Sequence, residues 1–374
     1  RGLQDPRVSP STLPVLVHDL GTQTDDPPTQ YSISSQALST VAIDELRRYR
    51  CFVTPQGWVL ALDPTSCQTF LWRPQDGERI QLPPKKQGFP ESCKCLLSDM
   101  PGAASGCAVV VFDLDDRQMW VCKIGATDWD SHRYEPAMYV KGKIPRMSMR
   151  NIARCHGIAA VGDKIYFELT AREMGVIEFD GKAGLKLDTI EVDMVDLPLS
   201  TPMASMYLVE SCGDFFLVVI FFDGDNVHKI ANHAIYKMDF SGPEWCEVDE
   251  IGADTVFLLG GDMLGKSCFG ASCLAPEPGR RGNCIYFLNH MATTESFLHV
   301  IDLKTGTEQV QWPFRHNGYH MPVRLPFWLL PTESTFQAQG LSFVPCNPRP
   351  LARRYLFNFS CIFFFFLFLF RTMY

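Results

Sequence analysis

The sequence predicts an all-β fold, and three observations support this prediction. Short apolar runs rich in Val, Ile, Phe and Tyr recur along the chain, such as Thr255–Leu259 and Cys284–Leu288. Gly, Pro, Asn or Asp closes each run, which is typical of turns between strands. The runs fall into groups of four that repeat about every 50 residues, the spacing of propeller blades. Together they predict a single β-propeller of about six to seven four-stranded blades.

The first segment, residues 1–48, is rich in loops and prolines. Its two apolar runs, Pro14–Gly21 and Tyr31–Ser34, predict early strands, one of which could complete the last blade and close the ring. Ser39–Arg48 predicts the one convincing short helix, because it starts with Ser and Thr, carries acidic residues in its middle and ends with two Arg residues.

The segment 49–345 is expected to form the propeller. The predicted strands of its five copies are Arg50–Val53, Trp58–Leu62, Thr69–Trp72 and Ile80–Leu82; Cys93–Leu97, Cys107–Phe112 and Gln118–Ile124; Ile158–Val161, Lys164–Leu169, Met174–Phe179 and Leu187–Val192; Ser205–Val209, Phe215–Phe222, Ala234–Phe240 and Trp245–Val248; and Thr255–Leu259, Cys284–Leu288, Phe297–Leu303 and Glu308–Trp312. One or two further blades are expected from the termini, with late strands in Pro326–Pro331 and Leu341–Val344. Two β-sandwiches are the alternative arrangement, but the regular grouping by four favours the propeller.

The third segment, residues 346–374, does not follow the repeating pattern of short strands. Its apolar run Tyr355–Phe370 is rich in Phe and is somewhat shorter than the roughly 20 residues that span a membrane. Arg353-Arg354 precedes the run and Arg371 follows it, so a C-terminal membrane anchor is one interpretation. A translated intron or alternative exon is the preferred one. In both cases the tail is not part of the propeller.

Composition excludes several classes of function. With 46% hydrophobic and 20% charged residues in 374, the chain is globular. The net charge of -8 argues against nucleic-acid binding, and basic spots such as Lys85-Lys86 and Arg280-Arg281 are short pairs in Pro- and Gly-rich loops. The 14 cysteines contain no Cys-x-x-Cys pair, which argues against a zinc site or a disulfide framework. Reduced thiols and the lack of a secretory signal indicate the cytoplasm or the nucleus.

No pattern of catalytic or metal-binding residues emerges. There is no Gly-x-Ser-x-Gly elbow, and prolines flank His316 and His320 where a zinc-binding helix would be needed. Asp113–Asp116 and Asp223–Asn226 lack the further ligands of a calcium loop and are expected to form turns. Gly260–Gly265 lacks the spacing of a phosphate loop. We therefore expect no enzyme, metal or cofactor. An enzyme with a site in the central channel of the propeller is the alternative.

One loop stands out as a candidate interaction site. The segment Ala126–Tyr134 is expected to connect two blades, and it contains Trp129, His132, Arg133 and Tyr134. Aromatic and Arg side chains in such loops are the residue types that anchor protein interfaces. The alternative is that Trp129 folds back onto a neighbouring blade and has a packing role. Trp58, Trp72, Trp120 and Trp245 lie in predicted strands and are expected in the core.

A family resemblance accompanies these features. It rests on motifs in a fixed order: CFVTPQGWVLALDP, FLWRP and ERIQLP in the first copy, VGDKIYFE and GVIEFD in the centre, FFLVVIFF and IYKMDF in the fourth copy, Ile251-Gly252 with Phe257 and Gly260, Asn283–Phe287, and PFWLLP near the end. These residues resemble the plant F-box-associated, KIB-type propellers, a kelch-like family. The resemblance covers roughly Pro14 to Pro331.

The resemblance implies a role in protein interaction. Members of this family commonly carry an F-box that docks on the Skp1-type adaptor of a ubiquitin ligase, while the propeller acts as the substrate receptor. Some are implied to bind a protein kinase. Only thirteen residues precede Pro14, which is too few for an F-box, so docking on the adaptor is not expected for this chain. The expected partner is a protein, either a kinase or a ubiquitination substrate.

Overall fold

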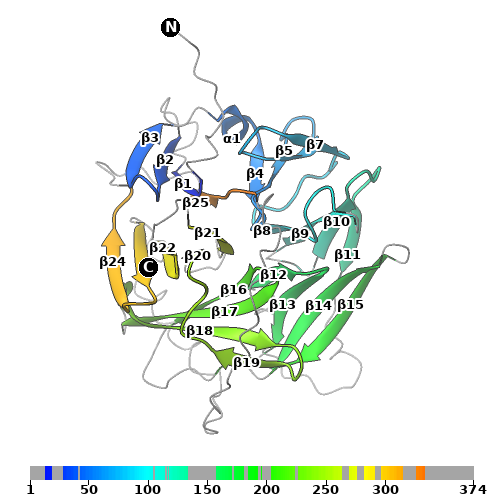
Figure 1. Ribbon diagram of the computed structural model, residues 1–374. Coiled ribbons are helices and arrows are strands. Elements are labelled where there is room, and N and C mark those ends of the chain that lie inside the picture. Colours follow the sequence, from blue (N-terminus) through cyan, green and yellow to red (C-terminus); the bar gives the residue numbers. More distant parts are fainter. Residues whose placement is uncertain are drawn as a thin grey trace, which may run out of the picture.

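Six sheets surround a common axis in the computed structural model, and the chain forms a six-bladed β-propeller (Figure 1). This confirms the predicted all-β fold and fixes the number of blades within the expected range. The structure describes residues 13–18, 28–40, 43–103, 106–113, 116, 118–133, 157–170, 172–180, 184–192, 195, 204–223, 226–262, 269–275, 282–290, 296–314 and 326–332.

Four blades follow one pattern, in which consecutive strands pair antiparallel from the axis outward. Blade 1 contains β4 (Arg50–Val53), β5 (Val59–Leu62), β6 (Thr69–Trp72) and β7 (Arg79–Leu82); blade 2 contains β8 (Cys93–Leu97), β9 (Ala108–Asp113), β10 (Gln118–Lys123) and β11 (Asp130–Arg133); blade 3 contains β12 (Ile158–Val161), β13 (Lys164–Thr170), β14 (Glu173–Asp180) and β15 (Gly184–Glu191); and blade 4 contains β16 (Ala204–Ser211), β17 (Asp214–Asp223), β18 (Asn226–Asp239) and β19 (Glu244–Glu247).

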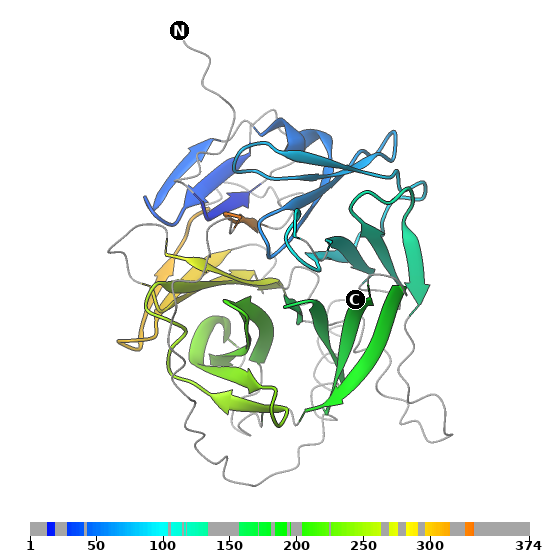
Figure 2. The ribbon, with the colours of Figure 1, turned by 45° about the vertical axis from the view of Figure 1, so that its right-hand side comes forward.

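Both ends of the described chain build blade 6, which closes the ring. Its sheet has the order β25 (Phe327–Leu329), β1 (Val15–His18), β2 (Thr29–Ser32) and β3 (Ala37–Thr40). The C-terminal strand β25 lies beside the N-terminal β1 in both views (Figures 1 and 2), with Leu16 opposite Trp328. The predicted ring-closing strand is therefore confirmed. The strand expected at Leu341–Val344 and the whole tail 346–374 lie outside the described residues.

Blade 5 differs from the others because it has five strands. Its order is β21 (Phe269–Leu274), β20 (Thr255–Asp262), β22 (Cys284–His290), β23 (Phe297–Asp302) and β24 (Thr307–Gln311), and β20 runs parallel to β22. The sequence analysis missed β21, the strand nearest the axis. The small residues in its centre give no apolar strand pattern, so the strand was not predicted. They also allow its close approach to blade 4, since a Cβ on Gly270 would lie 2.6 Å from the backbone oxygen of Leu208.

The predicted helix was too long at its N-terminal end. Helix α1 covers only Asp44–Arg48, whereas Ser39 and Thr40 belong to the outer strand β3 and pair with Gln30 and Thr29. The strand pairing prevails there because Ser and Thr have no strong helix preference and Thr is β-branched. The two Arg residues do occupy the last turn of the helix, as expected.

The core is a set of layers between neighbouring blades. Each of the six blade pairs shares its own cluster of buried apolar side chains. Strand β1 shows how a blade serves two layers: Val15 and Val17 pack toward blade 1, while Leu16 packs toward blade 5. This is the period of two that a strand buried on both faces requires. The ring is consequently held by continuous packing around its whole circumference.

The aromatic and cysteine predictions can be judged from the same layers. Trp58, Trp72, Trp120 and Trp245 are all buried, which confirms their expected core role. The ten cysteines among the described residues are free thiols. Burial raises the pKa of Cys107 and of Cys122 to about 12, so these thiols are protonated and unreactive at neutral pH.

Candidate functional site

The predicted interaction loop is only partly a loop in the structure. Part of it, Asp130–Arg133, is the outer strand β11 of blade 2, paired with Gln118–Val121 of β10. The expectation of a continuous loop over Ala126–Tyr134 was therefore wrong. The reason is that the polar sequence Asp-Ser-His-Arg suits an exposed edge strand, where three of its four side chains are exposed and the fourth is half-buried.

Trp129 folds back onto the neighbouring blade, which is the second of the two predicted alternatives. Only 8% of the residue is exposed. Its indole Nε1–H donates a hydrogen bond to the carbonyl oxygen of Pro83 at 2.9 Å, and its ring meets the edge of Phe89 with a centroid distance of 5.1 Å. The side chain joins blades 1 and 2 from inside the protein. It is not available to a partner in this conformation.

The other three residues predicted in the interaction loop are His132, Arg133 and Tyr134, and the structure describes the first two. Arg133 is exposed and lies 3.4 Å from a carboxylate oxygen of Asp116, and His132 is half-buried in the same strand. Tyr134 lies outside the described residues. An interaction role for His132, Arg133 and Tyr134 stays a prediction.

The polar clusters weighed in the sequence have local roles where the structure describes them. The Asp113 carboxylate accepts a hydrogen bond from the backbone N–H of Asp116 at 3.1 Å, and that of Asp223 pairs with Lys229. These contacts are those expected of turns. Across the described ranges, no three His, Cys, Asp or Glu side chains are arranged to hold a metal ion. His316, His320, Arg280 and Arg281 lie outside those ranges.

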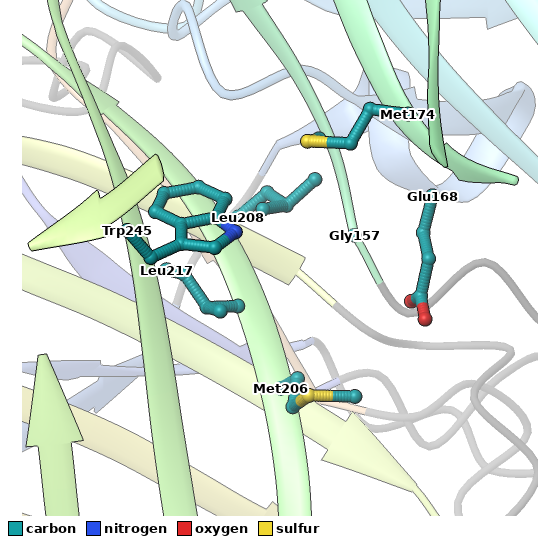
Figure 3. Close-up of a pocket in the computed structure, with 7 residues that line it drawn as sticks. All are labelled: Gly157, Glu168, Met174, Met206, Leu208, Leu217 and Trp245. Atoms are coloured by element: carbon teal, nitrogen blue, oxygen red, sulfur yellow. The ribbon is translucent and has the colours of Figure 1, made fainter. Parts of the chain in front are cut away.

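A small hollow lies between blades 3 and 4 (Figure 3). Its lining is largely apolar and consists of Gly157, Glu168, Met174, Met206, Leu208, Leu217 and Trp245. It encloses about 310 Å³, part of which is open solvent, and its interior has room for about one water molecule. An interior that admits about one water is too small for a substrate-sized molecule, because ligand pockets measure roughly 300–1,000 Å³.

Two polar groups face this hollow. The indole Nε1 of Trp245, a residue only 3% exposed, has no hydrogen-bond partner among the described residues. On the opposite side of the hollow, burial raises the pKa of the Glu168 carboxyl to about 7. A buried indole N–H commonly binds an ordered water, and one water is what the space admits. The hollow can therefore hydrate the buried indole of Trp245.

A second feature, which was not predicted from the sequence, is a cluster of aromatic rings between blades 4 and 5 that reaches solvent at Trp312. Trp312 follows β24 and is 52% exposed. Its ring and that of Phe297 meet edge to face with a centroid distance of 5.8 Å, and Phe297 also contacts the ring of His228 at 4.8 Å. We call Trp312, Phe297 and His228 the rim cluster. They come from blade 5 and from strand β18 of blade 4.

The rim cluster has the chemistry of an interaction anchor. Phe297 is buried and supports the Trp312 ring by an edge-to-face contact, while about half of the surface of Trp312, 52%, remains open to solvent. Trp is the residue most enriched among those that dominate binding energy at protein interfaces. A sequence signal for it existed: Trp312 ends the alternating row Glu308, Val310, Trp312, which places all three side chains on one face of the strand.

Among the described residues, no helix has the length and apolar character needed to cross a membrane. The apolar run of the tail, Tyr355–Phe370, lies outside those residues. The membrane-anchor interpretation of the tail thus stays untested.

Comparisons with solved structures give matches at low sequence identity. A streptogramin B lyase is 10% identical, with 88% of this chain and 93% of that chain covered and a TM-score of 0.33. Virginiamycin B lyase from Staphylococcus aureus is 12% identical, with 71% and 69% covered and a TM-score of 0.31. Apo AztD from Citrobacter koseri is 10% identical, with 79% and 93% covered and a TM-score of 0.34. Similarity at this level carries no argument about the activity of this chain.

A comparison with curated proteins gives no match. The family comparison, in contrast, covers most of the propeller. The KIB1-4 beta-propeller is matched over residues 30–314, from the second strand of the closing blade to the residues that follow β24. This chain therefore belongs to the KIB1-4 beta-propeller family.

Proposed function

We propose that this propeller is a non-enzymatic interaction module that binds a protein partner. In this proposal it acts as the substrate receptor of a ubiquitin ligase or as a kinase-binding domain, which are the roles implied by its resemblance to plant F-box-associated propellers. The observation that carries the proposal is the exposed Trp312, whose ring contacts Phe297 at the seam between blades 4 and 5, where Phe297 in turn contacts His228.

The fold supports this role physically. A ring with a packed layer between every pair of blades keeps its rim residues at fixed positions. A fixed anchor loses little conformational entropy when a partner binds, so more of the contact energy becomes affinity. Trp312 fits this requirement because its ring rests on the buried Phe297.

Two further observations favour binding over catalysis. The hollow between blades 3 and 4 admits about one water, and in the described ranges no trio of potential metal ligands converges. The proposed location is the cytoplasm or the nucleus, which the free cysteines of the described residues support, since both compartments are reducing.

The test is affinity capture from plant cell extract with the full chain as bait, followed by mass spectrometry. The key variant is Trp312→Ala, and the matched control is Leu38→Ala, which removes a side chain of similar exposure, 53%, from β3 of blade 6. We expect wild type and Leu38→Ala to retain the same partner and Trp312→Ala to lose it. If wild type retains nothing beyond what an unrelated propeller retains, the interaction module is refuted.

A further inference from the structure

The seam beside Trp312 contains an unusual concentration of ionisable side chains. Strand β18, with fourteen residues, is much longer than its neighbour β19, and its first half packs over blade 5. It contributes His228 and His233, while blade 5 contributes His299 from β23 and Glu308 from β24. The Glu308 carboxylate thus interacts electrostatically with His299 and His233, and His228 interacts with His299.

Glu308 is tied to the most buried of these histidines. A carboxylate oxygen of Glu308 lies 2.5 Å from Nδ1 of His299, a residue with 0% exposure. The other ring nitrogen, Nε2, lies 3.5 Å from the side-chain amide nitrogen of Asn289, and the ring of Phe287 stacks against the imidazole at 5.8 Å. The imidazole is therefore fixed between a carboxylate, an amide and an aromatic ring.

Burial disfavours the protonated form of two histidines in this seam, His299 and His233. Burial lowers the pKa of His299, the adjacent His228 lowers it further, and Glu308 opposes both effects. Burial likewise lowers the pKa of His233, again against the effect of Glu308. In the described part of the chain, the one ion-pair partner of Glu308 is His299. Within the described ranges, no Lys or Arg side chain forms an ion pair with this carboxylate.

The remaining charges nearby cancel each other. Lys229 follows His228 in sequence, but its ammonium group pairs with Asp223 at 2.5 Å across the β17–β18 hairpin. The chain as a whole carries a net charge of -8. The surface along β24 therefore presents an anion, Glu308, an aliphatic side chain, Val310, and an open aromatic ring, Trp312.

We infer that the row of side chains from Glu308 and Val310 of β24 to the adjoining Trp312 binds an extended segment of a partner protein that carries Arg or Lys side chains. The inference rests on the proposed interaction role and names the chemistry of the partner. One cation would lie on the indole of Trp312, which attracts cations through its ring face. A second would pair with Glu308, about 13 Å away along the strand.

The seam also makes this binding sensitive to acid. Because the pKa values of His233 and His299 lie below the ordinary value of 6.5, these rings gain protons only as the pH falls below that value. Positive charge then surrounds Glu308 and repels a basic partner. Binding is expected at pH 7.5 and weaker at pH 5.5.

The experiment uses the full chain and a fluorescein-labelled peptide of Gly and Ser with two Arg residues four positions apart, read by fluorescence anisotropy at low salt. The Trp312→Ala variant should bind about fivefold more weakly, the effect of one exposed cation–π contact. Glu308→Gln should also weaken binding. The control variants Leu38→Ala and Asp188→Asn, both at exposed positions on other blades, should bind as wild type does. Thermal unfolding of each variant verifies that it is folded.

The outcomes separate this inference from the broader proposal. Stronger binding of the Arg peptide than of a matched Glu peptide, reduced by Trp312→Ala and by pH 5.5, supports it. Equal binding of the two peptides, no binding, or full binding by Trp312→Ala overturns it. If affinity capture still recovers a partner in that case, the interaction module stands and only the basic character of the partner is refuted.

Discussion

Closure of the ring can be tested at one glycine. Gly57 lies in the turn between β4 and β5 of blade 1 and has a φ of +82°. A Cβ at this position would lie 2.6 Å from the carbonyl oxygen of Pro331, which follows β25 of the closing blade. Because Pro331 presents its backbone there, neither partner can rotate away. Gly57→Ala should therefore push the two ends of the ring apart.

A matched control isolates the contact from the backbone strain. Gly77 has nearly the same φ, +79°, in the turn between β6 and β7, but a Cβ there would meet nothing within 4 Å. Gly77→Ala should cost only the strain of a left-handed residue, about 1–2 kcal/mol. Gly57→Ala should cost that amount plus the displacement of the Pro331 backbone, roughly 3–5 kcal/mol in all.

The assay is urea unfolding of wild type and both variants, followed by circular dichroism and by limited proteolysis. We expect Gly57→Ala to unfold at a lower urea concentration than Gly77→Ala and to expose the segment around β25 to protease. Equal destabilisation by the two substitutions would refute the close contact between blade 1 and the closing blade.

Three further predictions concern single side chains. Trp129→Phe loses the hydrogen bond to the Pro83 carbonyl and should lower the free energy of unfolding by about 1 kcal/mol. It should leave partner capture unchanged; lost capture at unchanged stability would contradict its inward role. The pKa of Glu168 is raised to about 7, so the folded state holds a proton that the unfolded state releases above its ordinary value of 4.5. The free energy of unfolding of wild type should accordingly fall relative to that of Glu168→Gln as the pH rises from 5 to 8. Urea unfolding at several pH values measures this, and a constant difference between the two proteins across the range would contradict the prediction. Gly157→Ala should destabilise the packing of blade 3 on blade 4, because its Cβ would lie 2.5 Å from Cγ of Leu208; an unchanged melting temperature would argue against that contact.

Strands with a clear apolar pattern could be predicted from the sequence at their observed bounds. Arg50–Val53, Thr69–Trp72 and Cys93–Leu97 are examples, since turn residues bound each run and the apolar side chains fill the blade layers. The strands that escaped prediction lack this pattern. The centre of Phe269–Leu274 consists of four small residues, Gly-Ala-Ser-Cys, where the strand lies close to blade 4, and Asp130–Arg133 is polar because it is an edge strand.

The candidate site was harder to predict than the fold. Trp129 was expected from its loop-like context to be a possible anchor, but its partner, the carbonyl of Pro83, belongs to another blade and leaves no trace in the local sequence. The rim cluster depends on the same kind of distant contact. His228 meets Phe297 only because β18 extends beyond β19 and reaches blade 5. Contacts of this kind are determined by how the blades are arranged, and no short sequence motif encodes them.

The most direct test of the account is site-specific photo-cross-linking in cells. A benzoylphenylalanine would replace Trp312 in one variant and Leu38 in the other, two positions of similar exposure on different blades. We predict that the partner cross-links from position 312 and not from position 38. Cross-links that form at position 38 while position 312 yields none would contradict the claim that this rim of blade 5 is where the propeller binds its partner.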